Sequence, residues 1–388
     1  MASLLLPIIY LAFISLGLPD ALLGAAWPTM YPQLGAQVSW AGGVSMIISA
    51  CTILSALASD RLNERLGTGR VTAISVATTA AALLGFSFCH AFWQLCLWAI
   101  PYGLGAGSVD AALNNYVALH YKSRHMSWLH CMWGVGASLG PVIMGQALAG
   151  SGWQGGYRII GILQVVLTVV LLFSLPLWKL PQDAMGGEPF TPQHRSFPKL
   201  LKITGVPEVL VCFLCYCALE STAGMWASSY CTLVRGLDAQ TAASWASLFY
   251  LGITAGRFVS GFLTIKMSDR NMIRLGQVLI ALGILLVLLP AGNNVLFVGL
   301  ILIGLGCAPV YPCIIHETPV NFGRELSMSM TGLQMAFAYV GSCLAPPLFG
   351  LLAQNVTPRL YPWYLAVGLV VMVIMSESLH AKKAAEHR

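Results

Sequence analysis

The sequence predicts an all-α membrane protein with twelve transmembrane helices in two six-helix bundles. Its 388 residues are 57% hydrophobic and only 9% charged, whereas roughly a quarter of the residues in a soluble domain are charged. Apolar runs recur along the chain, and a run of about 18 or more residues can cross a hydrocarbon core about 30 Å thick as a helix. A membrane β-barrel would need short alternating segments, and these runs are continuous.

Each predicted span corresponds to one apolar run. The twelve runs lie approximately at 4–31, 38–59, 70–90, 92–120, 126–149, 157–180, 206–234, 239–265, 271–291, 294–316, 325–354 and 360–379. The first run has no basic segment before it and no small-residue cleavage site after it, so we expect a retained span rather than a leader peptide.

One long polar connection divides the spans into six and six. It is rich in proline and glycine, which is typical of a linker. We therefore expect an N-terminal bundle at 1–180, a cytoplasmic linker at 181–205 and a C-terminal bundle at 206–388.

The basic residues predict the orientation. If the N-terminus is cytoplasmic, the inner loops and tail hold 16 of the 20 lysines and arginines, while the outer loops hold only Arg158, Arg235 and Arg359. The positive-inside rule then places both termini in the cytoplasm, and we expect a multi-pass protein of the inner (cell) membrane. The net charge of +6 follows from this topology. It does not indicate nucleic-acid binding, because no basic stripe with interleaved aromatic residues lies outside these loops.

Short segments of the first half recur in the second. "SDRLNERLG" at 59–67 matches "SDRNMIRLG" at 268–276, "GASLGPVIMG" at 136–145 matches "GSCLAPPLFG" at 341–350, and "DALLGAAW" in the first span matches "ESTAGMW" in the seventh. Each copy of the first pair is expected between the second and third spans of its half. Repeated halves are typical of secondary transporters, whose binding site lies where the halves meet near the bilayer midplane.

These motifs resemble those of a known transporter family. The repeated Asp-Arg segment resembles the loop signature of the major facilitator superfamily. Within that superfamily, "GLPDALLGAAWP", "GLGAGSVDAALNN", "CYCALESTAGMW" and "GITAGRFVSG" resemble segments of the fucose, galactose and glucose proton symporters. The resemblance covers nearly the whole chain and implies the major facilitator fold, alternating access and proton-coupled sugar uptake.

The fourth span contains a carboxylate, Asp110, with Asn114 one helical turn later on the same face. An ionisable group near the bilayer centre costs about 2.5–3.5 kcal/mol on insertion scales, so such groups usually face a cavity or a partner. A carboxylate that can exchange a proton within reach of water is what proton coupling requires. We therefore expect Asp110 to be the coupling residue, although a purely structural hydrogen bond to a neighbouring helix would also account for it.

Two other carboxylates lie within predicted spans. Asp20 in the first span is followed by Trp27, and Glu220 in the seventh by Trp226. Sugars suit this combination, because their C–H faces stack on aromatic rings while their hydroxyls need polar partners. The family resemblance implies that carboxylates of the first and fourth spans take part in sugar recognition and proton coupling. These positions correspond to Asp20 and Asp110, and Asn114 matches the amide one turn after the fourth-span acid.

Further polar residues are candidates for substrate binding or for hydrogen bonds between helices. His130 and Trp133 lie three residues apart in the fifth span, Gln334 lies in the eleventh, and Asn115 points about 100° away from Asn114. Arg257 in the eighth span is expected to pair with an acid or to extend to the interface, in a gating role.

The repeated loop segments are candidates for a gate. Charge-assisted bonds between helix ends can close one arrangement of the two halves and break in the other, whereas a solvated charged cluster would contribute little. The expected gating residues are Asp60, Arg61, Arg65, Asp269, Arg270 and Arg274.

Together these features predict a secondary transporter that takes up a monosaccharide or similar small polar solute, coupled to protons through Asp110 with Asp20 as the second candidate. The alternatives are sodium coupling, a proton-driven drug or metabolite antiporter, and a non-transporting sensor. An intramembrane aspartyl protease is disfavoured, because no GxGD element is present, and no P-loop indicates a nucleotide-dependent enzyme. We expect no enzyme activity, no cofactor, no metal site and a monomer in the bilayer. The eleven cysteines are scattered through the predicted spans, which disfavours a disulfide framework or a zinc site.

Overall fold

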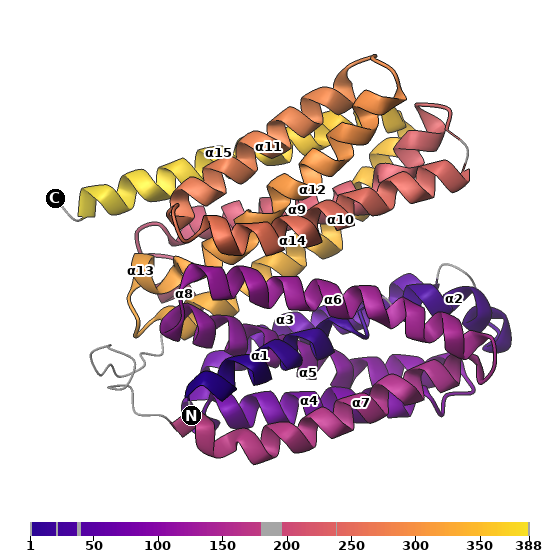
Figure 1. The fold of residues 1–388 in the computed structure, drawn as a ribbon, viewed down its shortest axis with the longest axis vertical. Helices are drawn as coiled ribbons and strands as arrows, with labels where there is room; N and C mark the ends of the chain where they lie inside the picture. The colour runs from indigo at the N-terminus through magenta and orange to yellow at the C-terminus, as the bar shows by residue number, and fades with distance from the viewer. Residues whose placement is uncertain (1, 21, 37–39, 180–195, 238, 387–388) are drawn as a thin grey trace. The chain divides into compact units, whose positions relative to one another are not determined.

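The computed structural model describes residues 2–20, 22–36, 40–179, 196–237 and 239–386, and every regular element in these ranges is helical (Figure 1). The helices of the first half are α1 (Ala2–Gly17), α2 (Leu22–Gln33), α3 (Trp40–Leu66), α4 (Thr68–Phe86), α5 (Phe92–His120), α6 (Ser123–Leu148), α7 (Gly152–Ser174) and η1 (Leu175–Lys179). Those of the second half are α8 (Phe197–Leu200), α9 (Val206–Leu233), α10 (Ala239–Leu263), α11 (Asp269–Leu288), α12 (Asn293–His316), α13 (Thr318–Phe322), α14 (Ser327–Asn355), η3 (Pro358–Leu360) and α15 (Tyr361–Glu386).

The helices confirm the all-α membrane class and account for twelve spans. Among the described residues, nine helices are long and apolar enough to cross a membrane: α3, α4, α6, α7, α9, α11, α12, α14 and α15. The remaining spans are α5, α10 and the pair α1–α2. Helices suit these sequences because every backbone N–H and C=O that enters hydrocarbon must be bonded within its own segment.

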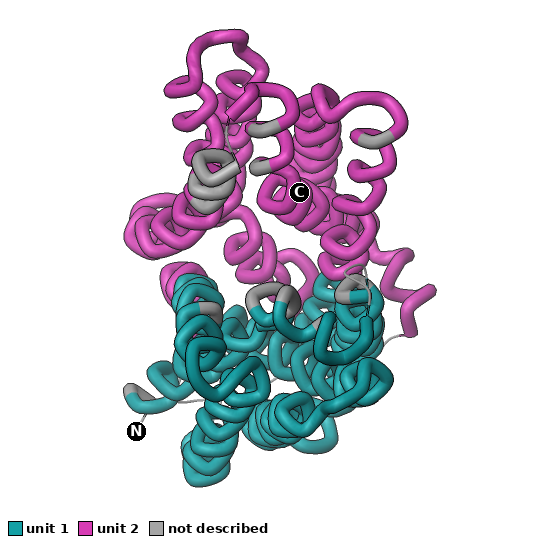
Figure 2. The backbone as a smooth tube through the Cα atoms, turned by 90° about the vertical axis from the view of Figure 1, so that its right-hand side faces the viewer, with its two compact units in different colours: residues 1–120, 129–194, 324–336 teal, residues 121–128, 195–323, 337–388 magenta. Residues whose placement is uncertain are grey.

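The chain divides into two compact units, coloured separately in Figure 2. Unit 1 comprises residues 1–120, 129–194 and 324–336, and unit 2 comprises residues 121–128, 195–323 and 337–388. The beginning of α6 therefore belongs to unit 2, and the beginning of α14 belongs to unit 1. Residues 181–195 of the predicted linker lie outside the described ranges, and its last ten residues contain the short helix α8.

The first predicted span is not one continuous helix. α1 ends at Gly17, a turn follows, and α2 begins at Leu22, with the Leu22 amide donating to the Pro19 carbonyl at 3.1 Å. Pro19 has no N–H and cannot donate to the helical bonding pattern, which weakens the helix at this point. Asp20 lies in this break, and not within a regular helix as the apolar run suggested.

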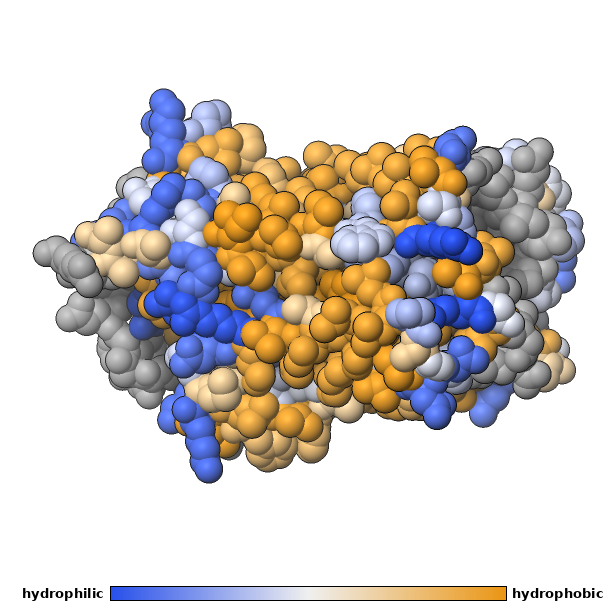
Figure 3. Space-filling model, turned by 90° about the horizontal axis from the view of Figure 1, so that it is seen from above, coloured by the Kyte–Doolittle hydropathy of each residue, from blue (hydrophilic) through white to orange (hydrophobic). Residues whose placement is uncertain are grey.

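Apolar side chains cover the outer faces of the helices, as expected for contact with lipid. On the face shown in Figure 3, hydrophobic residues gather between two hydrophilic ends. The large exposed side chains that form such surfaces include Phe173 of α7, Leu251 of α10 and Val367 of α15.

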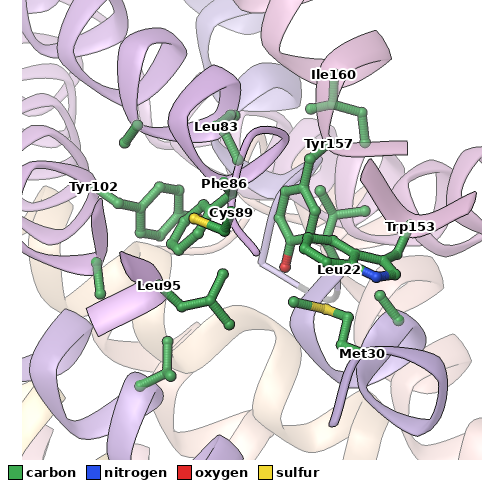
Figure 4. Packing of buried hydrophobic residues seen from close by; sticks show 14 of the residues in the cluster. Leu22, Met30, Leu83, Phe86, Cys89, Leu95, Tyr102, Trp153, Tyr157 and Ile160 are labelled. Atoms are coloured by element: carbon green, nitrogen blue, oxygen red, sulfur yellow. The ribbon is translucent and has the colours of Figure 1, made fainter. Parts of the chain in front are cut away.

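Aromatic packing fixes part of unit 1. Phe86 of α4, Tyr102 of α5, and Trp153 and Tyr157 of α7 share one buried cluster (Figure 4). The Trp153 indole N–H donates to Gln33 at 2.7 Å, which ties α7 to the end of α2. Aromatic side chains of this size each bury about 150–250 Å², so the cluster holds α2, α4, α5 and α7 in a defined arrangement.

Glycine contacts show that the two halves repeat the same packing. A Cβ added at Gly103 of α5 would lie 2.4 Å from the Ile48 carbonyl oxygen of α3, and a Cβ at Gly304 of α12 would lie 2.1 Å from that of Phe249 in α10. Both residues of the second pair lie 201 positions after those of the first. Such close approaches are possible only because glycine has no side chain.

The other helices repeat in the same way. Gly105 approaches the Ser75 carbonyl as Gly306 approaches that of Gly276, again 201 positions later. Gly136 of α6 approaches Ile14 of α1, and Gly341 of α14 approaches Leu214 of α9. Equivalent residues of the two halves are therefore 201 positions apart for α3, α4 and α5, 200 apart for α1 and 205 apart for α6.

This register corrects the expectation for the repeated loop motif. Its two copies in the sequence are 209 positions apart, eight more than the packing of the same helices. In unit 1 the segment 59–66 is still part of α3, and only Gly67, with φ +77°, separates it from α4. In unit 2 the copy begins with Ser268, the N-cap of α11. The two Asp-Arg pairs thus occupy different structural positions.

Candidate functional site

Asp20 is exposed although it lies within the first span, and two neutral donors hold its carboxylate. The Trp133 indole of α6 donates to Oδ2 at 2.8 Å, and the Tyr102 hydroxyl of α5 donates to Oδ1 at 3.3 Å. The break between α1 and α2 brings Asp20 to these helices. Two predicted site residues, Asp20 and Trp133, therefore meet directly.

Asp110, Asn114 and His130 form a second, buried group. The Asn114 amide donates to Asp110 Oδ1 at 2.8 Å and accepts from His130 Nε2 at 2.9 Å. Because the amide oxygen can only accept, His130 carries its proton on Nε2 in this network. Asn114 is fully buried and Asp110 is 6% exposed. The His130 ring packs against the Phe13 ring of α1 in a T-shaped arrangement.

Asp110 lies within electrostatic range of Asp20, and both networks involve α5 and α6 of unit 1. Unit 1 thus contains one solvent-exposed carboxylate and one buried carboxylate that can interact electrostatically, and both accept hydrogen bonds from uncharged donors.

Unit 2 contains a different kind of polar site. Arg257 of α10 pairs with Glu220 of α9 at 3.4 Å between Nη2 and Oε1, with side chains 4% and 20% exposed respectively. Tyr216, one turn before Glu220, donates its hydroxyl to the Cys307 carbonyl at 2.9 Å and lies within interaction range of both charges. The prediction that Arg257 pairs with an acid is met by Glu220.

Other predicted substrate-binding residues do not join these groups through the contacts that the structure describes. The Trp226 indole donates to the Pro346 carbonyl at 3.0 Å and its ring packs on Phe349 of α14, so it connects helices. Asn115 accepts from Ser327 at 2.5 Å. Gln334 is fully buried in α14, and the side chain of Trp27 lies outside the described residues.

Among the gating candidates of unit 1, Asp60 is held by hydrogen bonds. Asp60 accepts from the Ser329 hydroxyl at 2.9 Å and from the Arg61 amide at 2.6 Å, and both Arg61 and Arg65 are exposed. Asp60 therefore holds the start of α14 by a side-chain hydrogen bond.

The gating candidates of unit 2 form hydrogen bonds and ion pairs with other helices. Asp269 accepts from Ser123, at the start of α6, and pairs with His316 of α12 at 2.6 Å. The other nitrogen of His316 lies 3.1 Å from the Tyr121 carbonyl oxygen. A carboxylate and a carbonyl both only accept, so His316 donates from both nitrogens and carries a positive charge here.

Arg270 and Arg274 both bind Glu377 of α15, which was not predicted. Arg274 forms two bonds of 2.6 Å to this carboxylate, and Arg270 contacts it at 3.4 Å. The bidentate geometry is the strong form of an arginine–carboxylate pair, and it ties α11 to α15 within unit 2.

Sequence reasoning also missed two tyrosines. Tyr102 lies eight residues before Asp110 on α5, and Tyr216 lies four residues before Glu220 on α9. The spacing of four places Tyr216 on nearly the same helical face as Glu220, so a search for hydroxyl donors on that face would have found it. Tyr102 bonds Asp20 of another part of the chain, and its spacing from Asp110 carries no such signal.

No group of three or more His, Cys, Asp or Glu side chains within the described ranges could hold a metal ion. The polar groups described above form hydrogen bonds and ion pairs, and their carboxylates can exchange protons. Such groups can bind a polar solute and change charge, which is what a coupled transporter requires.

Comparison with known proteins identifies the family of this chain. A family model described as Major Facilitator Superfamily matches residues 9–247 and 235–386. Crystal structures of the transporter FucP, one of them titled the Escherichia coli fucose:proton symporter, superpose with TM-scores of 0.75 and 0.74 at 14% and 15% identity, covering 96–97% of this chain and 97% of FucP.

Two further proteins are similar. The human organic anion transporter MFSD10 superposes with a TM-score of 0.71 at 14% identity over 95% of this chain and 98% of its own. The probable nitrate/nitrite antiporter NarK1 of Thermus thermophilus is 26% identical over 375 residues, which is 84% of this chain and 82% of the antiporter. The structural likenesses at these identities establish the fold alone, while the family model matches almost the entire chain. The chain therefore belongs to the major facilitator superfamily of membrane transporters.

Proposed function

We propose that this transporter takes up a monosaccharide or similar small polar solute together with protons, by alternating access. The observation that carries the proposal is that unit 1 holds two carboxylates within electrostatic range of each other. Asp20 and Asp110 are retained inside spans at an energetic cost, and their partners Trp133, Tyr102 and Asn114 are uncharged donors.

The exposure of the two carboxylates suggests a division of roles. Asp20 is accessible and has an indole beside it, which suits the hydroxyls and the C–H face of a sugar. Asp110 is buried beside Asn114 and His130, so its charge is sensitive to what occupies the neighbouring site. Proton uptake at Asp110 and solute binding at Asp20 can then influence each other through their electrostatic interaction.

The likeness to the fucose:proton symporter agrees with this proposal, and the likeness to the nitrate/nitrite antiporter keeps the antiport alternative under test. The decisive experiment uses purified protein in liposomes with an imposed inward proton gradient and labelled fucose, galactose and glucose. We expect gradient-driven accumulation of at least one sugar. Accumulation driven by a sodium gradient instead would show that sodium is the coupling ion. Proton-driven dye efflux without sugar uptake would support the antiporter.

The first prediction concerns Asp110. In Asp110→Asn the side chain keeps its shape but cannot change charge, so accumulation should fall at least about tenfold while exchange of labelled for unlabelled sugar continues. Glu64→Gln removes an exposed carboxylate of α3 and should accumulate sugar normally. Concentrative uptake by Asp110→Asn at the unmodified rate would refute the coupling role.

A further inference from the structure

The ion pair of Arg257 and Glu220 has no counterpart at the equivalent positions of unit 1. By the packing register, Glu220 corresponds to Asp20, 200 positions earlier, and Arg257 corresponds to Ala56, 201 positions earlier. Ala56 is completely buried in α3. Unit 1 thus packs the equivalent helices with a methyl group at the position where unit 2 has a guanidinium.

A buried ion pair is also an expensive way to join two helices. Desolvating both charges can cost more than their attraction returns, and apolar residues of similar volume are often as stable or better. Arg257 and Glu220 therefore need an explanation other than the packing of α9 against α10.

The geometry of the pair leaves room for exchange. Charge-assisted N–H···O bonds are typically about 2.7–2.9 Å long, and arginine often binds a carboxylate through two of them. The distance between Arg257 Nη2 and Glu220 Oε1 is 3.4 Å, whereas Arg274 forms two bonds of 2.6 Å to Glu377. Glu220 is the more exposed partner, so it can move towards water when another anion takes its place.

Aromatic side chains surround the guanidinium. Tyr216 and Tyr311 lie within interaction range of Arg257, with their ring centroids 6.1 Å apart. Tyr311 corresponds in the packing register to Asp110, so a ring here replaces the buried acid of unit 1. The exposed Tyr250 reaches Gly224, where a Cβ would lie 2.2 Å from its hydroxyl.

We propose that Arg257 is a binding group for a carboxylate on the transported solute, which displaces Glu220, so that sugar acids are preferred over neutral sugars. This inference rests on the proposed uptake function for the direction and coupling of transport, but carboxylate binding at Arg257 can be measured without transport. The planar guanidinium suits a carboxylate better than an ammonium group would, and the surrounding tyrosines suit a sugar ring.

The test compares D-galacturonate with D-galactose, which differ in one carboxylate, by calorimetric titration of the purified full-length protein. The unmodified protein should bind galacturonate about 10- to 100-fold more tightly, the range for a hydrogen bond to a charged group. Arg257→Gln should abolish this preference. Glu220→Gln should increase galacturonate affinity, because the competing carboxylate is removed.

Controls separate binding from folding. Glu220→Gln/Arg257→Gln leaves no unpaired buried charge and should fold, yet bind both sugars equally. Arg235→Gln removes another arginine of unit 2, which bonds the Val287 and Leu289 carbonyls, and should keep the preference for galacturonate. Equal affinity of the unmodified protein for both sugars, or a preference that survives in the double variant, would overturn the inference.

The transport assay distinguishes the two proposals. Gradient-driven accumulation of galactose with no binding of galacturonate would leave the proposed function standing and remove the carboxylate site. Arg257-dependent binding of galacturonate without proton-driven uptake would remove the symport proposal and retain the site.

Discussion

The polar side chains of unit 1 differ in how much their stability depends on hydrogen bonds to one another. Asp20 is accessible to solvent and bonds side chains of two helices, whereas Asn114 is fully buried and connects Asp110 to His130. An exposed group can exchange a lost partner for water, but a buried amide cannot. The buried network should therefore be the more sensitive of the two to substitution.

His130→Ala tests this dependence. The change leaves the Asn114 carbonyl oxygen without its donor and removes the ring that packs on Phe13, which should lower the free energy of unfolding by about 1–3 kcal/mol. Thermal unfolding in detergent measures the change. The exposed His90 provides the control, because its backbone amide, which alanine keeps, donates to Gln94. His90→Ala should unfold at the unmodified temperature. An equal melting temperature for both variants would contradict the buried network.

Individual contacts of the site could be predicted only when they were local. Asn114 with Asp110 follows from a spacing of four residues on one helix, and the spacing of Tyr216 and Glu220 carries the same signal. Asp20 with Trp133 joins residues 113 positions apart, and Glu220 with Arg257 joins residues 37 apart. Composition identifies such residues as costly in a membrane, but it does not state which helices bring them together.

At the level of helices, hydropathy predicted twelve spans and the class of fold, because a bilayer permits few other structures. It did not predict the break at Pro19, since the apolar character continues through 4–31 without interruption. It also gave the wrong equivalence for the repeated Asp-Arg motif. Matching letters align the copies 209 positions apart, whereas backbone contacts at Gly103 and Gly304 require 201. Packing contacts therefore define the duplication more reliably than a short motif.

Helix contacts that use glycine should not accept a methyl group. In Gly136→Ala the new Cβ would lie 2.0 Å from the Ile14 carbonyl oxygen, so α1 and α6 must separate, at a cost of about 1–3 kcal/mol. Gly145 is on the same helix, and a Cβ there meets no atom of the described residues within 4 Å. Gly145→Ala should therefore raise stability by about 0.5–1 kcal/mol through helix propensity. Melting temperatures that move in the same direction for both variants would show that the α1–α6 contact is not close.

At the scale of the whole molecule, the two units share packing but not chemistry. The equivalent helices carry Asp20 and Asp110 with neutral donors in unit 1, and Glu220 with Arg257 and Tyr311 in unit 2. A duplicated scaffold can keep its glycine contacts while its polar residues diverge, because the helix seams and the side chains that face a solute are different positions. Specificity and coupling are then expected to be assigned to different units.

The orientation of the whole chain in the membrane gives the last prediction. Sixteen of the 20 basic residues lie in connections, helix ends and a tail on one predicted side of the membrane. The positive-inside rule predicts that this side is the cytoplasmic one. Lys266 and Gly292 are exposed residues on either side of α11, so cysteines at these positions should be on opposite sides of the membrane. A membrane-impermeant maleimide should label Gly292→Cys in intact cells and Lys266→Cys only after permeabilisation, above the background of the unmodified chain. The reverse pattern would invert the topology and make Arg158, Arg235 and Arg359 the cytoplasmic set.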